Sequence, residues 1–214
     1  MTGPLPMVPP ARAVIGAVGE ARFVNLLRLA REVVARLPWE ARLQELEIDL
    51  DRLVRAVNAG ASAPGGTWPA LFDAFVGHWV GGDLHDAERA YRHIWFPASL
   101  EGELLAQPVM MLGSAGEEPI LAYNVARRAH AGVEIRGVVG PHAHVGFRLE
   151  ATALLWVGEQ PEGWTSIHAE RVRARGQLYD IRGLVFRRAP DGKLETVPSD
   201  WRYHRVAPGA IRLG

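Results

Sequence analysis

The chain contains no cysteine, and this absence excludes several kinds of chemistry. It can form no disulfide bond, it has no thiolate nucleophile, and it offers no cysteine ligand to a metal ion. A chain without cysteine fits a reducing compartment, so we expect a cytoplasmic location.

The chain also lacks an excess of either charge and any long apolar run. Its formal net charge is +0, and Lys193 is its only lysine. This balance gives no electrostatic reason to expect nucleic acid or an anionic membrane as a partner. No apolar run approaches the roughly 18 residues of a membrane-spanning helix. Residues 1–10 are rich in proline and have no basic segment, so we expect no signal peptide.

What is present is the composition of an ordinary globular protein, with 48% hydrophobic and 22% charged residues. We divide the chain into residues 1–66, a Pro-rich start with a helical hairpin and a linker, and residues 67–214, the main domain. The spacing predicts one helix over 20–37 and another from Trp39 to about residue 58. The second carries an apolar stripe at alternating steps of three and four, formed by Leu43, Leu46, Leu50, Leu53 and Val57. We expect this stripe to cover the mouth of the main domain as a lid or to contact a second subunit in a homodimer.

The main domain reads as helices followed by strands, which is an α+β order. Aromatic residues at helical spacing from Trp68 to Trp79 predict its first helix, residues 84–91 a second, and residues 117–130 a third. The remaining segments predict strands over 94–97, 103–112, 133–139, 144–157, 166–172, 178–187 and 194–206.

One motif in the first predicted helix has a second interpretation. Gly77-His78-Trp79 fits the Gly-x-Trp signature with which lipocalin-like proteins begin their first strand. Because Trp79 completes the helical aromatic series, we favour a helix.

The strongest local signal lies near the C-terminus. Asp191-Gly192 separates two strand-like runs, which is typical of a β-hairpin. This hairpin, the aromatic helix before Gly82-Asp83 and Gly116-Glu117-Glu118 opening the next helix together resemble the nuclear transport factor 2-like superfamily. That superfamily includes SnoaL-like polyketide cyclases, ketosteroid isomerases and limonene-epoxide hydrolases. The resemblance implies a cone-shaped, curved antiparallel sheet wrapped on three helices, here with an extra N-terminal helical hairpin.

The resemblance also implies catalytic residues. In SnoaL-like cyclases and related isomerases a carboxylate on a late strand removes a proton next to a carbonyl group, and Asp200 would take this role here. In limonene-epoxide hydrolases an Arg-x-Asp pair on a strand activates water. Arg148 and Glu150 lie at those positions, and strand alternation predicts that they share one face. The alternative interpretation of Arg148 and Glu150 is a surface ion pair. The alternative interpretation of Asp200 is that it belongs to a simple turn.

Two histidines complete the candidate catalytic set. His144 with His142, and His168 with Glu170, show the alternate spacing that places two side chains on one face of a strand. They could act singly as acid or base, or together ligate zinc or iron, although a structural role is the simpler interpretation. We therefore expect no metal and no cofactor. Four aromatic residues are expected to bind substrate: Trp79, Tyr91, Trp95 and Tyr203.

The sequence thus favours a cofactor-free lyase, isomerase or cyclase that acts on a small hydrophobic or polyketide-like substrate. An epoxide hydrolase or epoxide-opening cyclase is a second hypothesis. A non-catalytic ligand-binding or assembly module is a third, because a fold alone does not establish a function.

Overall fold

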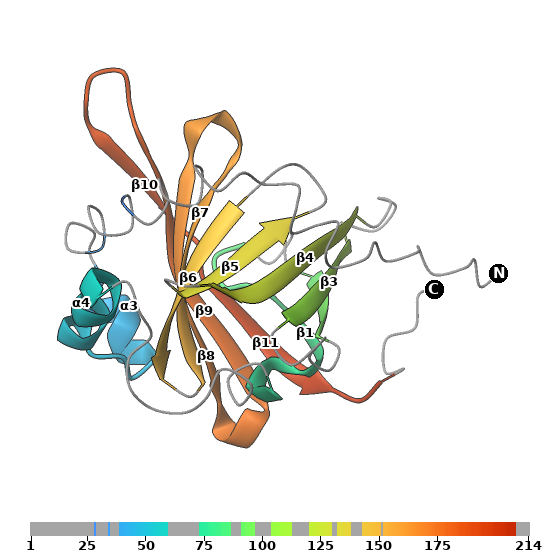
Figure 1. The fold of residues 1–214 in the computed structure, drawn as a ribbon. Coiled ribbons are helices and arrows are strands. Elements are labelled where there is room, and N and C mark those ends of the chain that lie inside the picture. The colour runs from blue at the N-terminus through green and yellow to red at the C-terminus, as the bar shows by residue number, and fades with distance from the viewer. Residues whose placement is uncertain are drawn as a thin grey trace.

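A computed structural model gives the fold of the chain (Figure 1). It describes residues 39–59, 73–86, 91–96, 104–112, 120–129, 132–137, 143–150 and 152–208, together with Arg28 and Val34. In these ranges the protein is α+β, with an antiparallel sheet and few helices.

The sheet is built almost entirely from neighbours in the sequence. Its strand order is β10-β9-β11-β1-β2-β3-β4-β5-β6-β7-β8, and all of its pairings are antiparallel. β9 pairs with β8 along one edge and with β10 and β11 along the other, so the pairings lead from β9 through β1 to β8 and back to β9. The strands in the described ranges are β1 (Gly77–Asp83), β2 (Tyr91–Phe96), β3 (Leu104–Leu112), β4 (Ile120–Ala129), β5 (Gly132–Gly137), β6 (Ala143–Glu150), β7 (Ala153–Glu159), β8 (Thr165–Arg173), β9 (Leu178–Arg188), β10 (Leu194–Pro198) and β11 (Trp201–Val206).

The hairpin at Asp191-Gly192 is confirmed. β9 and β10 pair antiparallel from Leu194↔Arg188 to Pro198↔Leu184. Gly192 has φ +83°, a conformation that glycine adopts without steric cost. The loop extends away from the rest of the sheet (Figure 1). The predicted strand 194–206 is divided into β10 and β11, because Ser199 and Asp200 interrupt the strand after Pro198.

Two of the three helices predicted for the main domain are wrong in most of the residues that the structure describes. In the first of them, residues 73–75 are helical. Gly77–Asp83 is strand β1, and its Gly77-His78-Trp79 therefore opens a strand, as the second interpretation of that motif held. Ile120–Ala129, expected within the third helix, is strand β4. β4 pairs with β3 on one edge and with β5 on the other, so tertiary hydrogen bonding overrides a short helical pattern. Half of the second predicted helix, residues 87–90, lies outside the described residues. Of the other half, residues 84–86 are not helical, and Tyr91 opens strand β2.

The strand predictions are largely confirmed, with one division that the sequence did not indicate. The segment 144–157 was expected to be a single strand but forms β6 and β7, which pair antiparallel with each other. Thr152 lies in a turn between them, and no glycine or proline at this point of the sequence marks the turn.

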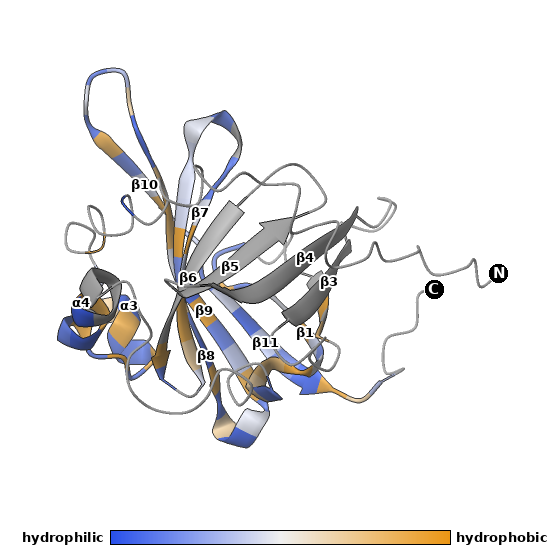
Figure 2. Cartoon of the chain, in the orientation of Figure 1, coloured by the Kyte–Doolittle hydropathy of each residue, from blue (hydrophilic) through white to orange (hydrophobic). Residues whose placement is uncertain are grey.

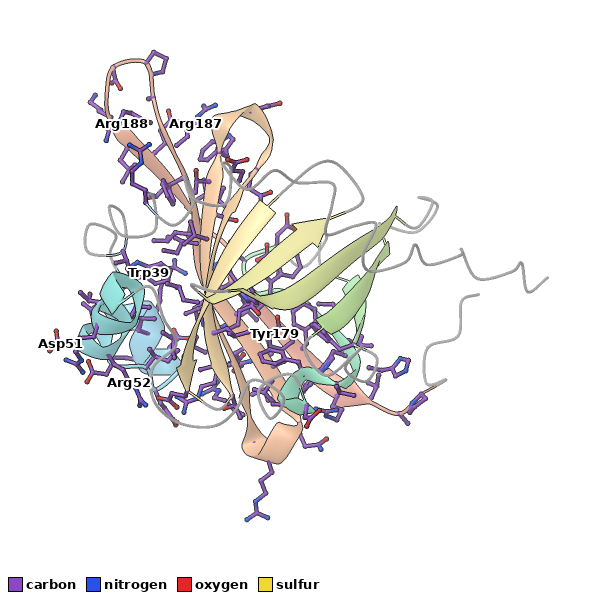
Figure 3. The ribbon with its side chains drawn as sticks, in the orientation of Figure 1. Trp39, Asp51, Arg52, Tyr179, Arg187 and Arg188 are labelled. Atoms are coloured by element: carbon purple, nitrogen blue, oxygen red, sulfur yellow. The ribbon has the colours of Figure 1, made fainter. Side chains whose placement is uncertain are left out.

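Two short helices pack on one face of the sheet, which we call the helix face. They are α3 (Glu40–Glu45) and α4 (Leu50–Ala59), and Glu47 between them has φ +57°, so the predicted second helix is broken there. α4 lies against β6 and α3 against β9, and Trp39 lies next to the two helices (Figures 1 and 3). Their apolar residues form one core with residues of β6–β9: Val34, Trp39, Leu43, Leu46, Ile48, Leu53, Leu149, Ala153, Leu155, Val157, Ile167, Ala169, Leu184 and Phe186.

The described part of the apolar stripe packs on the chain's own sheet. Leu43, Leu46 and Leu53 are at most 1% exposed, and they share one core with residues of β6–β9. Of the first arm of the expected hairpin, the structure describes only Arg28 and Val34, and Val34 belongs to the same core. The side chain of Val57 lies outside the described residues. The expected lid and the expected contact with a second subunit stay predictions.

Arginines of β8 fasten the end of α3 to the sheet. Arg171 donates hydrogen bonds to the carbonyl oxygens of Leu46 and Glu47, and Arg173 donates to that of Glu45 at 2.8 Å. Carbonyl oxygens at a helix C-terminus have no partner within the helix and carry its negative dipole end, so cationic donors are favourable there.

The two faces of the sheet are chemically distinct because side chains alternate along each strand. On β7, Leu155 and Val157 join the helix-face core, whereas Leu154 and Trp156 point to the opposite side. Figure 2 shows this alternation of hydrophobic and hydrophilic residues along β8 and β9. Within the described residues, no helix is long and apolar enough to cross a membrane.

Candidate functional site

The face opposite the helices carries a second core, which we call the aromatic cluster. Its buried members are Phe75, Trp79, Ile94, Phe96, Leu154, Trp156, Val172, Tyr179, Ile181, Trp201 and Tyr203. Residues of β2 and β7 belong to this one cluster although β3–β6 lie between them in the strand order, so the sheet curves around it.

Tyr179 lies at the centre of the cluster (Figure 3). Its ring stacks on Tyr203 at 5.4 Å between centroids and meets Phe75 edge-on at 5.2 Å. Trp79 also contacts it edge-on, at 5.6 Å. Offset and edge-to-face contacts of this kind stabilise aromatic pairs beyond the burial of their area. Two residues expected to bind substrate, Trp79 and Tyr203, are thus members of this cluster.

One carboxyl group reaches the aromatic cluster. The Tyr179 hydroxyl donates a hydrogen bond to Oε2 of Glu170 at 2.7 Å, and the Trp156 side chain donates another to the same carboxyl group. Burial raises the pKa of Glu170 to about 7, although both hydrogen bonds act to lower it. Burial and the nearby negative charge of Glu170 in turn raise the pKa of Tyr179. Glu170 is therefore poised to gain or lose a proton near neutrality.

Glu170 is less enclosed than the tyrosines beside it. Tyr179 and Tyr203 are 1% exposed, whereas Glu170 and His168 are only partly buried. Burial is nevertheless the largest influence on the pKa of Glu170.

His168 shares the face of Glu170, as their alternate spacing on β8 predicts. His168 pairs in register with Trp156 of β7 and with Gly183 of β9. A Cβ atom at Gly183 would lie 2.3 Å from Cδ2 of His168, so glycine leaves the room that the imidazole occupies. The expectation that His168 and Glu170 lie together on one face is confirmed.

Two more predicted residues occupy register positions in the same rows. Arg148 of β6 pairs with Leu154, which pairs with Glu170. His144 pairs with Gly158, which pairs with Ser166 of β8. The side chains of Arg148 and His144 lie outside the described residues, as do those of Tyr91 and Trp95 on β2, so their predicted roles stay predictions. Among the described residues, no three metal-binding side chains gather into a candidate metal site.

Glu150 lies on the helix face, whereas the side chain of Arg148 lies outside the described residues. The register of β6 against β7 shifts between these two residues, which interrupts the alternation that would place them together. Glu150 instead pairs with Arg171 at 2.7 Å and with Arg52 of α4 at 3.0 Å, on the helix face. These contacts match the ion-pair interpretation of Glu150, and its catalytic pairing with Arg148 stays a prediction.

Asp200 is buried, but its carboxylate is already fully engaged. It accepts hydrogen bonds from Arg42 of α3, from Nε2 of His85 at 2.6 Å and from the backbone N–H of Gly183 at 3.1 Å. Burial pushes the pKa of Asp200 upward, but these hydrogen bonds outweigh it and hold that pKa below its usual value. A carboxylate with a low pKa is a weak base, so the geometry favours a structural role for Asp200. Its hydrogen bonds connect three segments: helix α3, strand β9 and the turn that follows β1.

Sequence reasoning named Glu170 only as a possible metal ligand and did not consider Tyr179 or Trp156 at all. One feature of the sequence could have identified Glu170: it is an acidic residue in the interior of a predicted strand whose other face is apolar. Such a residue is costly unless it is paired, and it therefore indicates a functional position. The sequence matches no known family model and no curated protein sequence.

Proposed function

We propose that the chain binds a small, largely apolar molecule against the aromatic cluster and carries out acid–base chemistry on it without a cofactor. In this proposal Glu170 exchanges a proton with the molecule, and the Tyr179 hydroxyl supports the carboxylate. The activity belongs to the class of a lyase, isomerase or cyclase.

The observation that carries this proposal is the 2.7 Å hydrogen bond between Tyr179 and Glu170 inside the aromatic cluster. A general base works best when its pKa is near the working pH, and burial brings the pKa of Glu170 to about 7. The resemblance to the nuclear transport factor 2-like superfamily and its cone-shaped fold remain predictions. Because expected helices of that fold are strands here, the proposal rests on Glu170 and not on the resemblance.

The epoxide-opening hypothesis has less support. It needs Arg148, Glu150 and Asp200 to converge, whereas Glu150 binds Arg52 and Arg171 on the helix face. A non-catalytic assembly module is a second candidate function, and one observation favours it. Tyr179, Tyr203 and Trp79 are packed to at most 1% exposure, which is typical of a filled core.

A probe of proton abstraction tests the first candidate. A base removes the proton from carbon 3 of 5-nitrobenzisoxazole, the N–O bond breaks, and a coloured cyanophenolate forms. We expect the rate with the full chain to rise as Glu170 ionises and to level off above about pH 7. The substitution E170Q is expected to lower the rate by about a hundredfold, the usual contribution of a general base.

Two further variants make this result specific. E162Q alters an exposed carboxyl group in the turn Pro161–Gly163 and should leave the rate unchanged. E150Q tests the epoxide-opening set, and a large loss of activity there would favour that set over Glu170. If no variant changes the rate but E170Q abolishes binding of an apolar dye, the chain is a binding protein rather than an enzyme.

A further inference from the structure

We propose that the helix face carries a separate binding site for a phosphate-type oxyanion, next to the end of α3. The site consists of three arginines gathered around one buried carboxylate: Arg173, Arg182, Arg202 and Asp180. It goes beyond the proposed function, because it lies on the face opposite Glu170 and uses none of the residues of that site.

The topology of the sheet brings these residues together. Strands β8, β9 and β11 run side by side, with β9 in the middle (Figure 1). Arg173, Arg182 and Arg202 each directly follow a residue of the aromatic cluster, so strand alternation directs all three to the helix face. Asp180 of β9 lies opposite Arg202 of β11 in the register of the two strands.

Asp180 orients the three guanidinium groups. Its side chain is 0% exposed. Its Oδ1 accepts a hydrogen bond from Nε of Arg202 at 2.7 Å, and its Oδ2 accepts one from Nε of Arg173 at 3.0 Å. Nη1 of Arg182 lies 3.7 Å from Oδ1, on the same side of the carboxylate as Arg202. Burial pushes the pKa of Asp180 upward, but the hydrogen bonds from Arg202 and Arg173 hold it below its usual value, so this group carries a negative charge.

The charges of this group do not balance. The second carboxylate described here belongs to Glu45, the last residue of α3, whose Oε2 accepts a hydrogen bond from Nε of Arg182 at 2.8 Å. Three guanidinium groups and two carboxylates leave one positive charge, in a chain whose formal net charge is +0. The next carboxylate along the chain, Asp200, is already paired with Arg42 and His85. The surplus is therefore local.

One of the arginines is fixed and buried, and another is open to solvent. Arg182 is 3% exposed, and its Nη1 donates hydrogen bonds to two backbone carbonyl oxygens. Arg202 is 38% exposed, and only its Nε is engaged; among the described residues, no acceptor contacts its Nη1 or Nη2. The planar donors of arginine match the oxygen atoms of a phosphate or carboxylate group. Arg202 thus offers unused donors beside a guanidinium that is already held in place.

Glu45 shows where the oxyanion would bind. Its side chain is 61% exposed, yet its carboxylate contacts the buried Arg182, so an anionic group from the surface already reaches this position. The backbone carbonyl oxygen of Glu45 is held separately by Nη1 of Arg173 at 2.8 Å. The end of α3 therefore stays in place when the Glu45 side chain moves away. An incoming oxyanion replaces this carboxylate at Arg182 and gains the free donors of Arg202.

The experiment measures binding of two probes, inorganic phosphate and phenyl phosphate, to the full chain. Isothermal titration is carried out at pH 7.5 with sodium chloride adjusted to a constant ionic strength, so that general screening is the same throughout. We expect both probes to bind at millimolar concentration or below. Equal affinities assign the site to a free oxyanion, whereas tighter binding of phenyl phosphate assigns it to a phosphate group carried on an organic molecule.

Three variants test the geometry. R202Q removes the open donors and should weaken phosphate binding about tenfold, the effect of losing hydrogen bonds to a charged group. E45Q removes the competing carboxylate and should tighten phosphate binding about threefold, as expected for one exposed charge. R188Q is the matched control, because Arg188 is an exposed arginine of β9 that donates to the carbonyl oxygen of Gly192 in the hairpin loop. It should leave the affinity unchanged.

The tightening in E45Q separates a binding site from a purely structural ion-pair network, in which losing Glu45 would improve nothing. The inference fails if neither probe binds, if R202Q binds phosphate as well as the unaltered chain does, or if R188Q weakens binding as much as R202Q. It also fails if E45Q weakens phosphate binding. Near-UV circular dichroism checks the fold of each variant, and if R202Q does not fold, the E45Q result decides. The reaction with 5-nitrobenzisoxazole tests the opposite face, so the inference and the proposed function can fail independently.

Discussion

The guanidinium carbon of Arg205 lies 4.2 Å from the centroid of the Trp79 ring, and this contact joins the first strand of the sheet to the last. The same side chain donates hydrogen bonds to three backbone carbonyl oxygens, those of Ala74, Val76 and Gly176. Gly77 leaves room for it, since a Cβ atom there would lie 2.3 Å from Nη1 of Arg205. Arg205 therefore holds together segments that are far apart in the sequence.

Replacing Arg205 should destabilise the fold. R205M leaves three carbonyl oxygens without their donor and removes the cation from Trp79, for an expected loss of about 2–4 kcal/mol in the free energy of unfolding. R205K keeps the charge but not the planar fork, so it should recover only part of the loss. Urea unfolding followed by tryptophan fluorescence measures both. Equal midpoints for R205M and the unaltered chain would contradict this role.

Glu170 should make the fold less stable as the pH rises. Folding raises its pKa from the model-peptide value of 4.5 to about 7, so the folded chain holds the proton more tightly than the unfolded chain does. The stability from this group is complete below pH 4.5 and is lost as the pH rises through about 7. The lost contribution is about 3 kcal/mol at most, from the size of the pKa change.

E170Q isolates this contribution. The difference in stability between E170Q and the unaltered chain should move in favour of the variant between pH 4.5 and pH 8, because the other titrating groups are common to both. Thermal melts across this range give the difference at each pH, with E162Q as a control for the loss of an exposed charge. A difference that is constant with pH would show that Glu170 is not desolvated in the folded protein.

The sequence predicts the strands of the C-terminal half because their signals are local. Asp191-Gly192 and the two runs beside it determine a hairpin without help from the rest of the chain. The segments that became β1 and β4 carry weaker signals, since short apolar runs fit both a helical and a strand period. Their state depends on partners, β11 and β2 for β1, and β3 and β5 for β4, which no local pattern contains.

The candidate site could be predicted only in part for a related reason. Alternation along β8 correctly places His168 beside Glu170 on one face. Alternation alone does not predict the register shift between Arg148 and Glu150, because this shift follows from the pairing of β6 with β7. The pairing of Glu170 with Tyr179 joins two strands, and the engagement of Asp200 by Arg42 joins residues 158 positions apart. Contacts of this length are set by the fold as a whole.

Close approach of β1 and β11 should make Gly81 intolerant of any side chain. A Cβ atom there would lie 1.8 Å from the carbonyl oxygen of Arg202 and 2.6 Å from Cα of Tyr203, and both are backbone atoms that cannot move aside alone. We expect G81A to lose about 3 kcal/mol or more, at the upper end of overpacking effects.

Gly192 provides the matched comparison for Gly81. It has φ +83° but nothing within 4 Å of a Cβ position, so G192A should lose only about 1 kcal/mol from the left-handed conformation. Chemical denaturation of both variants gives the two losses. A larger loss for G192A than for G81A would contradict the close approach of the two strands.

The hydrogen bonds of Asp200 should stabilise the folded chain. D200N removes the charge that Arg42 and His85 contact and leaves the guanidinium of Arg42, whose side chain is 19% exposed, without its carboxylate partner. We expect a loss of about 1–3 kcal/mol at pH 7, the range for hydrogen bonds to a charged group. Because the pKa of Asp200 is held below its ordinary value of 3.8, the stabilisation is present above that pH and is lost as the pH falls through the lower folded value. The melting temperatures of D200N and the unaltered chain should therefore differ at pH 7 and converge near pH 2. A variant that melts normally at pH 7 but loses a hundredfold in activity would instead return Asp200 to the role of catalytic base.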